Sequence, residues 1–238
     1  AVRGLKLLMK HRVPATVRVT IHRKNVRELD GVARFLLEEI DIPNFGTNSA
    51  SYMGLCRQNA DDVQLTTEDR VLAMETLLRL NQKYNGRINA TAGPLAEARG
   101  WLEMERARKE GKERIPGRGF LTGCGGPMSK MAVRADGIMV PCIQLSHIEL
   151  GRINKDSLEE VWQNHPELKK MRERCHIPLS KFEYCQDCPY INYCTGNCPA
   201  TSYTITGEVD FPSPDACLKR FLEEGGRLPD MNLFADTE

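Results

Sequence analysis

The spacing of its cysteines constrains this chain more than any other feature of its sequence. The 238 residues include nine cysteines, and eight of them lie after residue 123. Four fall within fourteen residues, in a C-x2-C-x5-C-x3-C run at Cys185, Cys188, Cys194 and Cys198. Cysteines two residues apart can direct both thiols at one metal centre, whereas wider spacings wrap the chain around a larger centre or bridge two. We therefore expect the chain to bind metal through thiolates.

The remaining cysteines are Cys56, Cys124, Cys142, Cys175 and Cys217. An odd total makes a complete disulfide framework awkward, and clustered thiols in a reducing compartment bind metal more often than they pair. Cys56, in a polar loop after a predicted strand, is expected to be a free thiol rather than a catalytic one. Cys175, just beyond a basic helix end, is likewise expected to be a bystander, with metal ligation as the alternative.

The overall composition excludes several classes of partner. Thirty-three basic and thirty-two acidic residues leave a formal charge of +1, which does not favour nucleic acid or an anionic membrane surface. The sequence has no apolar run of membrane-spanning length and no secretory signal at its start. Since 41% of the residues are hydrophobic, the chain can bury a core, and we expect a globular cytoplasmic protein.

The first 110 residues repeat a strand followed by a helix. After an amphipathic helix over 1–11, strands are expected at 15–21, 42–47 and 87–92, and helices at 25–39, 67–84 and 94–110. Asn25 is expected to cap the first of these three helices, and a polar loop is expected to run to Gln64. Three such units predict parallel strands with right-handed crossovers, as in an α/β barrel or an open sheet. Polar residues at the strand ends are candidates for the border of an active-site cleft: Thr20, Asn25, Asn48 and Thr91.

A change of composition predicts a domain boundary between residues 112 and 113. The stretch 110–123 is basic and rich in glycine and proline, which is typical of a linker. Strands at 131–134 and 138–140 then flank a hairpin turn in which Gly137 is expected to take a positive φ. Ser157 is expected to cap a following helix that Pro166 kinks or splits.

Taken together, the seven cysteines after residue 123 other than Cys175, with Gly137 in register, resemble the SPASM domain of radical S-adenosylmethionine (SAM) enzymes, over roughly 123–228. The upstream units resemble the second half of the partial (β/α)6 barrel that precedes SPASM domains. The fold class implied is α/β: the C-terminal part of a radical SAM barrel over 1–112, followed by a small cysteine-rich α+β SPASM domain over 113–238.

The resemblance implies two auxiliary 4Fe-4S clusters. The outer cluster would be ligated by the outer cysteines, Cys185, Cys188, Cys194 and Cys217. The inner cluster would take the inner cysteines, Cys124, Cys142 and Cys198. The fourth ligand of the inner cluster stays open, because the stretch after Cys124 contains no further cysteine: an open iron, Cys175 or a non-cysteine ligand would each complete it.

The motif that binds the SAM cluster is missing from this sequence. Radical SAM chemistry uses a C-x3-C-x2-C loop to hold a third 4Fe-4S cluster together with SAM, and no three cysteines here have that spacing. We expect this chain alone to be inactive. The N-terminal half of a parent enzyme is expected to lie outside the sequence; a partner chain that supplies it, or a cluster-bearing fragment without catalysis, are the alternatives.

The resemblance implies a parent oxidoreductase that abstracts a hydrogen atom from a peptide or protein during its maturation. A substrate peptide is the expected partner, together with a reductase such as flavodoxin or ferredoxin. Two other classes remain open. One is an iron-sulfur electron-transfer or binding module without SAM chemistry, and the other is an interaction domain stabilised by zinc, since C-x2-C pairs also build zinc ribbons.

Overall fold

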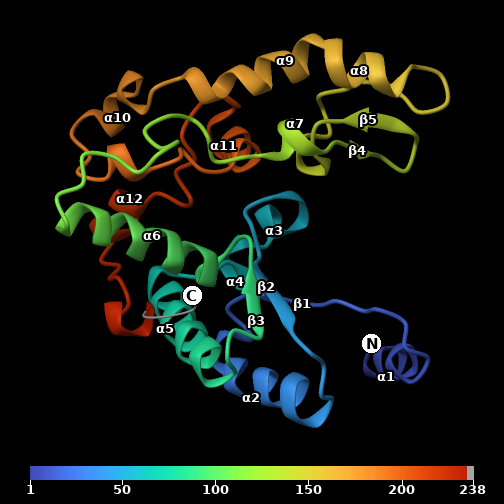
Figure 1. Ribbon diagram of the computed structural model, residues 1–238, viewed down its shortest axis with the longest axis vertical. Helices are drawn as coiled ribbons and strands as arrows, with labels where there is room; N and C mark the ends of the chain where they lie inside the picture. The colour runs from blue at the N-terminus through green and yellow to red at the C-terminus, as the bar shows by residue number, and fades with distance from the viewer. Residues whose placement is uncertain (235–238) are drawn as a thin grey trace. The chain divides into compact units, whose positions relative to one another are not determined.

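The computed structural model describes residues 1–234 (Figure 1). The chain divides into two compact units, one formed by Ala1–Glu103 and the residues from Phe221 on, the other by Met104–Arg220. The break between them falls inside helix α6 (Pro94–Lys109), and the chain returns to the first unit within α12 (Leu218–Glu223). The domain boundary between residues 112 and 113 stays a prediction.

A parallel three-stranded sheet organises the first unit, as the sequence predicts. Its strands lie in the order β1 (Val17–Ile21), β2 (Phe45–Ser49) and β3 (Ile88–Ala90). Thr47 in the central strand pairs with Val19 on one side and with Ala90 on the other. All three strands therefore end at the same edge of the sheet.

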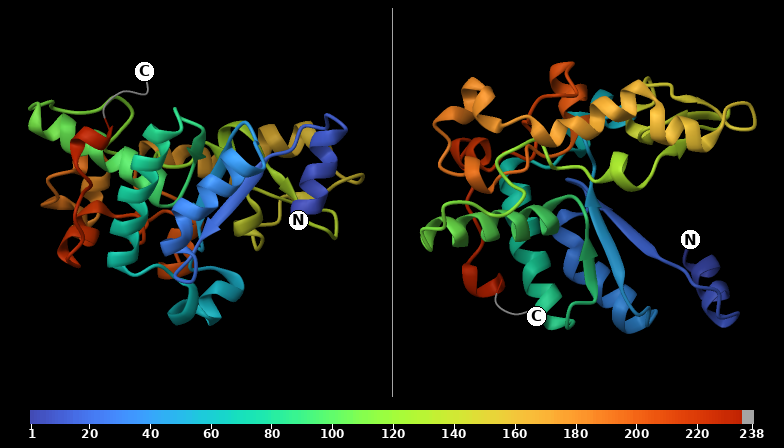
Figure 2. Two further views of the ribbon diagram at one scale, coloured as in Figure 1. Left: turned by 90° about the horizontal axis from the view of Figure 1, so that it is seen from below. Right: turned by 45° about the horizontal axis from the view of Figure 1, so that its top comes forward.

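Helices α2 (Leu29–Arg34) and α5 (Thr67–Lys83) lie beside this sheet, whereas α1 (Val2–Lys10) lies away from it (Figures 1 and 2). Helix α1 precedes β1. After β1, a 3-10 turn (Val26–Glu28), α2 and a π-helical turn (Phe35–Glu39) follow one another without a break. The prediction that the Asn25 side chain caps this helix is wrong. It turns back instead, accepting a hydrogen bond from the His22 amide and donating one to the Thr20 carbonyl.

Helix α5 (Thr67–Lys83) is fixed at its start by a capping box. Thr66 Oγ1 accepts from the Asp69 amide at 3.1 Å, and the Asp69 carboxylate accepts from the Thr66 amide at 3.3 Å. Leu77, Leu78 and Leu80 bury the other end of the helix in the core. α6 begins at Pro94, as predicted, because proline needs no amide partner at the first helical position.

The polar loop expected before Gln64 is partly helical, so that expectation is wrong in detail. Two short helices, α3 (Gly54–Gln58) and α4 (Ala60–Val63), occupy it. Asn59 joins them by donating a side-chain hydrogen bond to the Leu55 carbonyl at 2.9 Å. Helices this short depend on such local bonds rather than on periodic apolar residues, so the sequence pattern does not reveal them.

The second unit begins with an antiparallel sheet. After α7 (Gly126–Ser129), β4 (Ala132–Val133) and β5 (Ile138–Val140) form the predicted hairpin, in which Gly137 has φ +86°. A third strand, β6 (Gly151–Arg152), pairs with β5 and was not predicted. A 3-10 turn (Ile143–Leu145) lies between β5 and β6.

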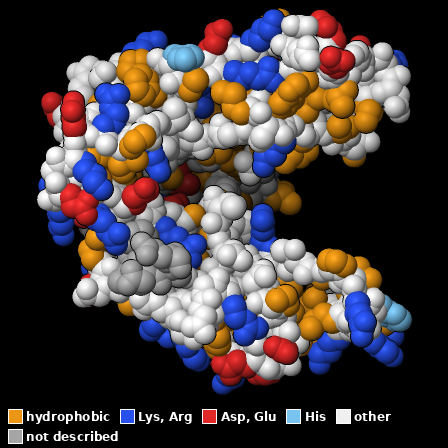
Figure 3. Space-filling view, viewed as in Figure 1, with side chains coloured by type: hydrophobic (Ala, Val, Ile, Leu, Met, Phe, Trp, Pro, Cys, Tyr) orange, Lys and Arg blue, Asp and Glu red, His pale blue; other side chains and the backbone are white. Residues whose placement is uncertain are grey.

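Two helices pack on this sheet. α8 (Leu158–Asn164) and α9 (Pro166–Glu173) are separated at His165, as expected from Pro166. Met139, Leu150, Val161 and Leu168 form the core between sheet and helices. Apolar side chains also appear among charged ones on the visible surface of this region (Figure 3). Beyond it lie two 3-10 turns (Arg174–His176, Leu179–Lys181), α10 (Glu183–Gln186), a further turn (Ile191–Tyr193) and α11 (Pro199–Thr206).

No helix among residues 1–234 combines the length and the apolar character that a membrane span requires.

Candidate metal centre

The four outer cysteines surround one cavity. Cys185, Cys188, Cys194 and Cys217 all line a space of about 370 Å³ inside the second unit. Its wall also contains apolar side chains, among them Leu179, Ile191, Ile205 and Phe211. The structure thus brings together thiols that the sequence spreads over 33 residues.

Short turns aim these thiols into the cavity. Cys185 lies on α10, and the Cys188 amide donates to the Cys185 carbonyl at 3.2 Å, which closes the C-x2-C turn. The Cys217 amide donates to the Pro214 carbonyl at 3.4 Å, in a second turn on the cavity wall. Local backbone bonds therefore shape the turns that carry these thiols.

The thiols stand in a setting that disfavours thiolates in the absence of a cation. Burial raises the pKa of Cys185 to about 12, and the neighbouring thiols of Cys194, Cys217 and Cys188 act in the same direction. Burial likewise raises the pKa of Cys194 to about 11, while the Gly196 amide opposes that shift. Several thiolates at such a site need a positively charged partner.

The geometry differs from that of a single-ion site. Among residues 1–234, no three His, Cys, Asp or Glu side chains converge closely enough to hold one metal ion. Thiols arranged around a cavity, rather than around a point, suit a cluster of several metal atoms.

The segments that carry two inner cysteines lie side by side. The Thr122 and Gly123 amides both donate to the Thr195 carbonyl at 2.9 Å. Gly123 packs so closely that a Cβ atom there would lie 2.3 Å from the Asn197 carbonyl oxygen. Since Cys124 and Cys198 directly follow Gly123 and Asn197, their backbones are neighbours.

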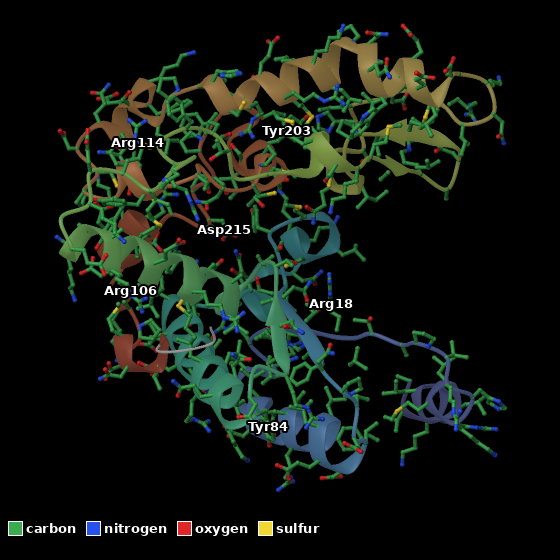
Figure 4. All side chains as sticks on the ribbon, viewed as in Figure 1. Arg18, Tyr84, Arg106, Arg114, Tyr203 and Asp215 are labelled. Atoms are coloured by element: carbon green, nitrogen blue, oxygen red, sulfur yellow. The ribbon has the colours of Figure 1, made fainter. Side chains whose placement is uncertain are left out.

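An aromatic contact links the third inner cysteine to the same region. Cys142 directly precedes the 3-10 turn after β5, and Cys198 directly precedes α11. His147, five residues beyond Cys142, stacks on Tyr203 of α11 with ring centroids 4.0 Å apart; Tyr203 is labelled in Figure 4. The loop that follows Cys142 therefore packs against the helix that follows Cys198.

A backbone amide donates to one sulfur among the outer cysteines and to one among the inner cysteines. The Gly196 amide lies 3.3 Å from Cys194 Sγ, and the Gly126 amide lies 3.4 Å from Cys124 Sγ. Such N–H···S bonds stabilise thiolates and influence the potentials of iron-sulfur clusters. Gly196 thus allows the backbone to approach the Cys194 sulfur closely.

Two buried polar side chains near these cysteines have no counterpart among the sequence-based candidates. Arg174 is 3% exposed and Ser213 is 2% exposed. Burial lowers the pKa of Arg174, whereas the Asp210 carboxylate and the thiols of Cys124 and Cys198 raise it. Arg174 follows a run of basic residues at a helix end, where the sequence suggests a solvent-exposed cation. Nothing in the sequence therefore predicts its burial.

The other predicted residues lie apart from the cavity wall. The Cys175 thiol donates to the Arg172 carbonyl, with Sγ 3.1 Å from the oxygen, and Cys56 lies on α3 of the first unit. Tyr190 and Tyr193 are buried packing residues: Tyr190 donates to Glu105 Oε2 at 3.0 Å and Tyr193 to the Lys112 carbonyl at 2.5 Å.

Three of the four predicted strand-end residues meet at the carboxyl edge of the parallel sheet. Thr20 Oγ1 donates to Asn48 Oδ1 at 3.1 Å, and Asn25 Nδ2 donates to the Thr20 carbonyl at 3.0 Å. Thr91 follows β3 in a bend at the same edge. This is the edge at which parallel sheets place their ligand sites.

Comparison with known proteins identifies relatives of both parts of the chain. A family model of the SPASM domain, an iron-sulfur cluster-binding domain, matches residues 124–189. Native anSMEcpe with bound AdoMet and Kp18Cys peptide superposes on 94% of this chain with a TM-score of 0.57 and 16% sequence identity. A hexahistidine-tagged form of anSMEcpe with bound AdoMet also superposes on 94%, with a TM-score of 0.56 and 19% identity.

The match extends over only part of those enzymes. This chain covers 58% of the first anSMEcpe chain and 55% of the second. At such low identity the likeness shows a shared fold, and anSMEcpe is a radical SAM/SPASM enzyme of the anaerobic sulfatase-maturating type. The predicted resemblance is confirmed: residues 124–189 match the model of the SPASM iron-sulfur cluster-binding domain, and the α/β chain shares the fold of anSMEcpe.

Proposed function

We propose that this chain holds two auxiliary 4Fe-4S clusters of a radical SAM enzyme that modifies a peptide or protein. The observation that carries the proposal is the convergence of Cys185, Cys188, Cys194 and Cys217 on one cavity. Four thiolates ligate a 4Fe-4S cluster completely, and the iron atoms supply the positive charge that these buried thiols require.

The inner cluster has three assigned thiolates, from Cys124, Cys142 and Cys198. The contact between Gly123 and Asn197 and the stacking of His147 on Tyr203 support this grouping. An open iron remains our first candidate for the fourth position, with Cys175 or a non-cysteine ligand as alternatives. If Cys175→Ala retains full iron and sulfide, Cys175 is not that ligand.

When bound, the clusters supply one-electron redox chemistry to the substrate site. The residues of this chain would fix their position and environment. The cysteines hold the irons, the Gly126 and Gly196 amides stabilise individual sulfurs, and Leu179, Ile191 and Phe211 exclude water from the outer cavity. Apolar surroundings and few hydrogen bonds favour a low potential, so each polar contact to a sulfur matters.

The parent enzyme would combine these clusters with SAM at a third 4Fe-4S cluster. We propose that the parallel sheet is part of a (β/α)6 barrel, with Thr20, Asn25, Asn48 and Thr91 bordering the cleft for SAM and substrate. A peptide substrate is supported by structures of anSMEcpe with bound peptides. A flavodoxin or ferredoxin would supply electrons, and the reducing cytoplasm would protect the clusters.

Two alternatives make different predictions. A zinc-stabilised interaction domain would be colourless and would contain no acid-labile sulfide. An electron-transfer module would contain the clusters and be a complete protein without SAM chemistry. The match of residues 124–189 to an iron-sulfur cluster-binding domain supports iron-sulfur clusters rather than zinc.

Anaerobic reconstitution with iron and sulfide tests the proposal. Two clusters correspond to about eight irons and eight sulfides per chain. Replacing all four outer cysteines by serine should lower both counts to about four, while Cys56→Ser, the matched control, should leave them at about eight. The proposal would be rejected if the chain bound zinc and contained no sulfide, or if the quadruple variant bound as much iron as the unsubstituted chain.

A further inference from the structure

Two buried side chains in the described part of the structure, Arg174 and Ser213, carry polar atoms that no protein group satisfies. These atoms are Ser213 Oγ and Arg174 Nη2. Buried polar groups nearly always have hydrogen-bond partners, and leaving one unpaired costs about 1–3 kcal/mol. Each orphaned atom is therefore a candidate donor to a group bound nearby.

Ser213 lies on the wall of the outer cavity, together with the four outer cysteines. Its amide donates to the Gly196 carbonyl at 2.9 Å, which fixes the serine backbone beside the turn after Cys194. The side chain is 2% exposed, so bulk water does not satisfy the hydroxyl. The serine thus brings an unpaired hydroxyl to the wall of the cavity.

Arg174 lies beside the inner cysteines. Phe120 forms an antiparallel bridge with Pro178, and the Leu121 amide donates to the Ile177 carbonyl at 3.0 Å. These contacts bring the segment that leads to Cys124 alongside the segment that follows Arg174. The thiols of Cys124 and Cys198 raise the pKa of the guanidinium against the larger lowering by burial, which agrees with that placement.

Only part of the Arg174 guanidinium is used within the protein. Nε donates to Asp210 Oδ1 at 3.1 Å, and that ion pair holds the head group in place. Nη2 is left without a partner although the side chain is 4% exposed. A cluster with three thiolate ligands carries net negative charge, so its sulfurs match this unpaired cationic donor.

We propose that Ser213 donates a hydrogen bond to the outer cluster and Arg174 donates a charged hydrogen bond to the inner cluster. The inference rests on the proposed function. Reduction adds one electron, and hence one negative charge, to a cluster. Each donor stabilises the reduced form more than the oxidised form and thereby raises the reduction potential. The two potentials are thus set separately, with the charged donor acting on the inner cluster.

Ser213→Ala tests the outer contact. In the reconstituted chain, dithionite supplies one electron per cluster, and EPR monitors the reduction of each. The variant should lower one midpoint potential and leave the other unchanged, with about a tenfold change in the reduced-to-oxidised ratio, or about 59 mV for a one-electron couple. Ser202→Ala is the control, because Ser202 is equally buried but donates to the Glu208 carbonyl at 2.9 Å.

Arg174→Gln should lower the other midpoint potential, by at least as much. Arg172→Gln removes the same charge two residues away, where Nε and Nη2 already donate to the Pro127 and Trp162 carbonyls. That control should change neither potential by a comparable amount. Arg174→Lys retains the charge and should give a smaller shift of the same sign, which provides a measurement if the glutamine variant does not fold.

The outcomes separate this inference from the function on which it rests. Failure of the unsubstituted chain to form clusters overturns the proposed function. Formation of both clusters with unchanged potentials in Ser213→Ala and Arg174→Lys overturns the inference alone. A shift of the same cluster in both variants overturns the assignment of one donor to each cluster. Electron-nuclear double resonance after exchange into deuterium oxide should show one strongly coupled deuteron fewer in each variant.

Discussion

Gly196 contributes both to the backbone conformation and to the candidate metal centre. Its φ of +69° is unfavourable for other residues, and a Cβ atom there would lie 2.4 Å from Leu121 Cδ2. Its amide at the same time donates to Cys194 Sγ. A side chain at this position would displace both the packing of Leu121 and a donor to the thiolate.

Gly196→Ala should therefore lower stability by about 1–3 kcal/mol from backbone strain, and by more because of the clash. Gly207→Ala is the matched control, since Gly207 has φ +83° but open space where a Cβ would lie. Thermal unfolding of the metal-free proteins measures the difference. Equal losses in the two variants would show that the contact with Leu121 is unimportant.

The buried thiols predict a pH dependence of the metal-free chain. The pKa of Cys194 is raised from 9.0 to about 11 in the folded state. A raised pKa means that the neutral thiol stabilises the fold below pH 9, and that this contribution is lost as the pH rises from 9 towards 11.

Across that pH range the free energy of unfolding of the unsubstituted chain should fall by about 1.4 kcal/mol per pH unit more than that of Cys194→Ser, because the serine hydroxyl does not titrate there. Denaturant unfolding at each pH measures the free energies, and the comparison removes the contributions of lysines and tyrosines. Parallel curves for the two proteins would contradict the burial of Cys194.

The residues that the sequence did not reveal are those whose roles depend on tertiary burial. The cysteines stand out by spacing alone, because thiols rarely cluster for other reasons. Arg174 and Ser213 belong to residue types that are normally exposed, and nothing near them in the sequence predicts 2–3% exposure. Their significance appears only when the partner of each polar atom is sought in three dimensions.

Among the elements, the close approach of 119–123 to 194–197 determines the inner site. Gly123→Ala would force Asn197 away, because a Cβ atom would lie 2.3 Å from its carbonyl oxygen. We expect this variant to lose the inner cluster and retain the outer one, so that iron falls from about eight to about four per chain.

Gly125→Ala is the control for that experiment, because no atom outside its chain neighbours lies within 4 Å of a Cβ there. It should retain about eight irons. Retention of both clusters in Gly123→Ala would show that the two segments need not touch for the inner site to form.

The predicted elements succeeded where a strong local signal coincided with the tertiary fold. The parallel strands, the capped helix after Thr66, the hairpin at Gly137 and the break at Pro166 are all present. The sequence did not predict α3, α4 or β6, which are two to five residues long. Such short elements have no measurable hydrophobic period, so no local pattern identifies them.

The whole chain lacks the C-x3-C-x2-C motif that the radical reaction requires. Even with both auxiliary clusters assembled, we expect it to produce no 5′-deoxyadenosine from SAM in the presence of dithionite. Chromatography of the reaction mixture provides the measurement, and iron and sulfide content confirms that the clusters are loaded. Formation of 5′-deoxyadenosine by this chain alone would show that it cleaves SAM by another route.

The distribution of the cysteines along the chain also bears on the order of folding. The outer cysteines span 33 residues and are aimed by local turns, whereas the inner ones span 75 residues, from Cys124 to Cys198. Closing a longer loop costs more conformational entropy, so contacts between residues close in sequence form sooner. The outer centre should therefore assemble first and act as a nucleus. Because Cys198 lies between Cys194 and Cys217, assembly of the outer centre would hold one inner ligand in place before the rest of its site has folded.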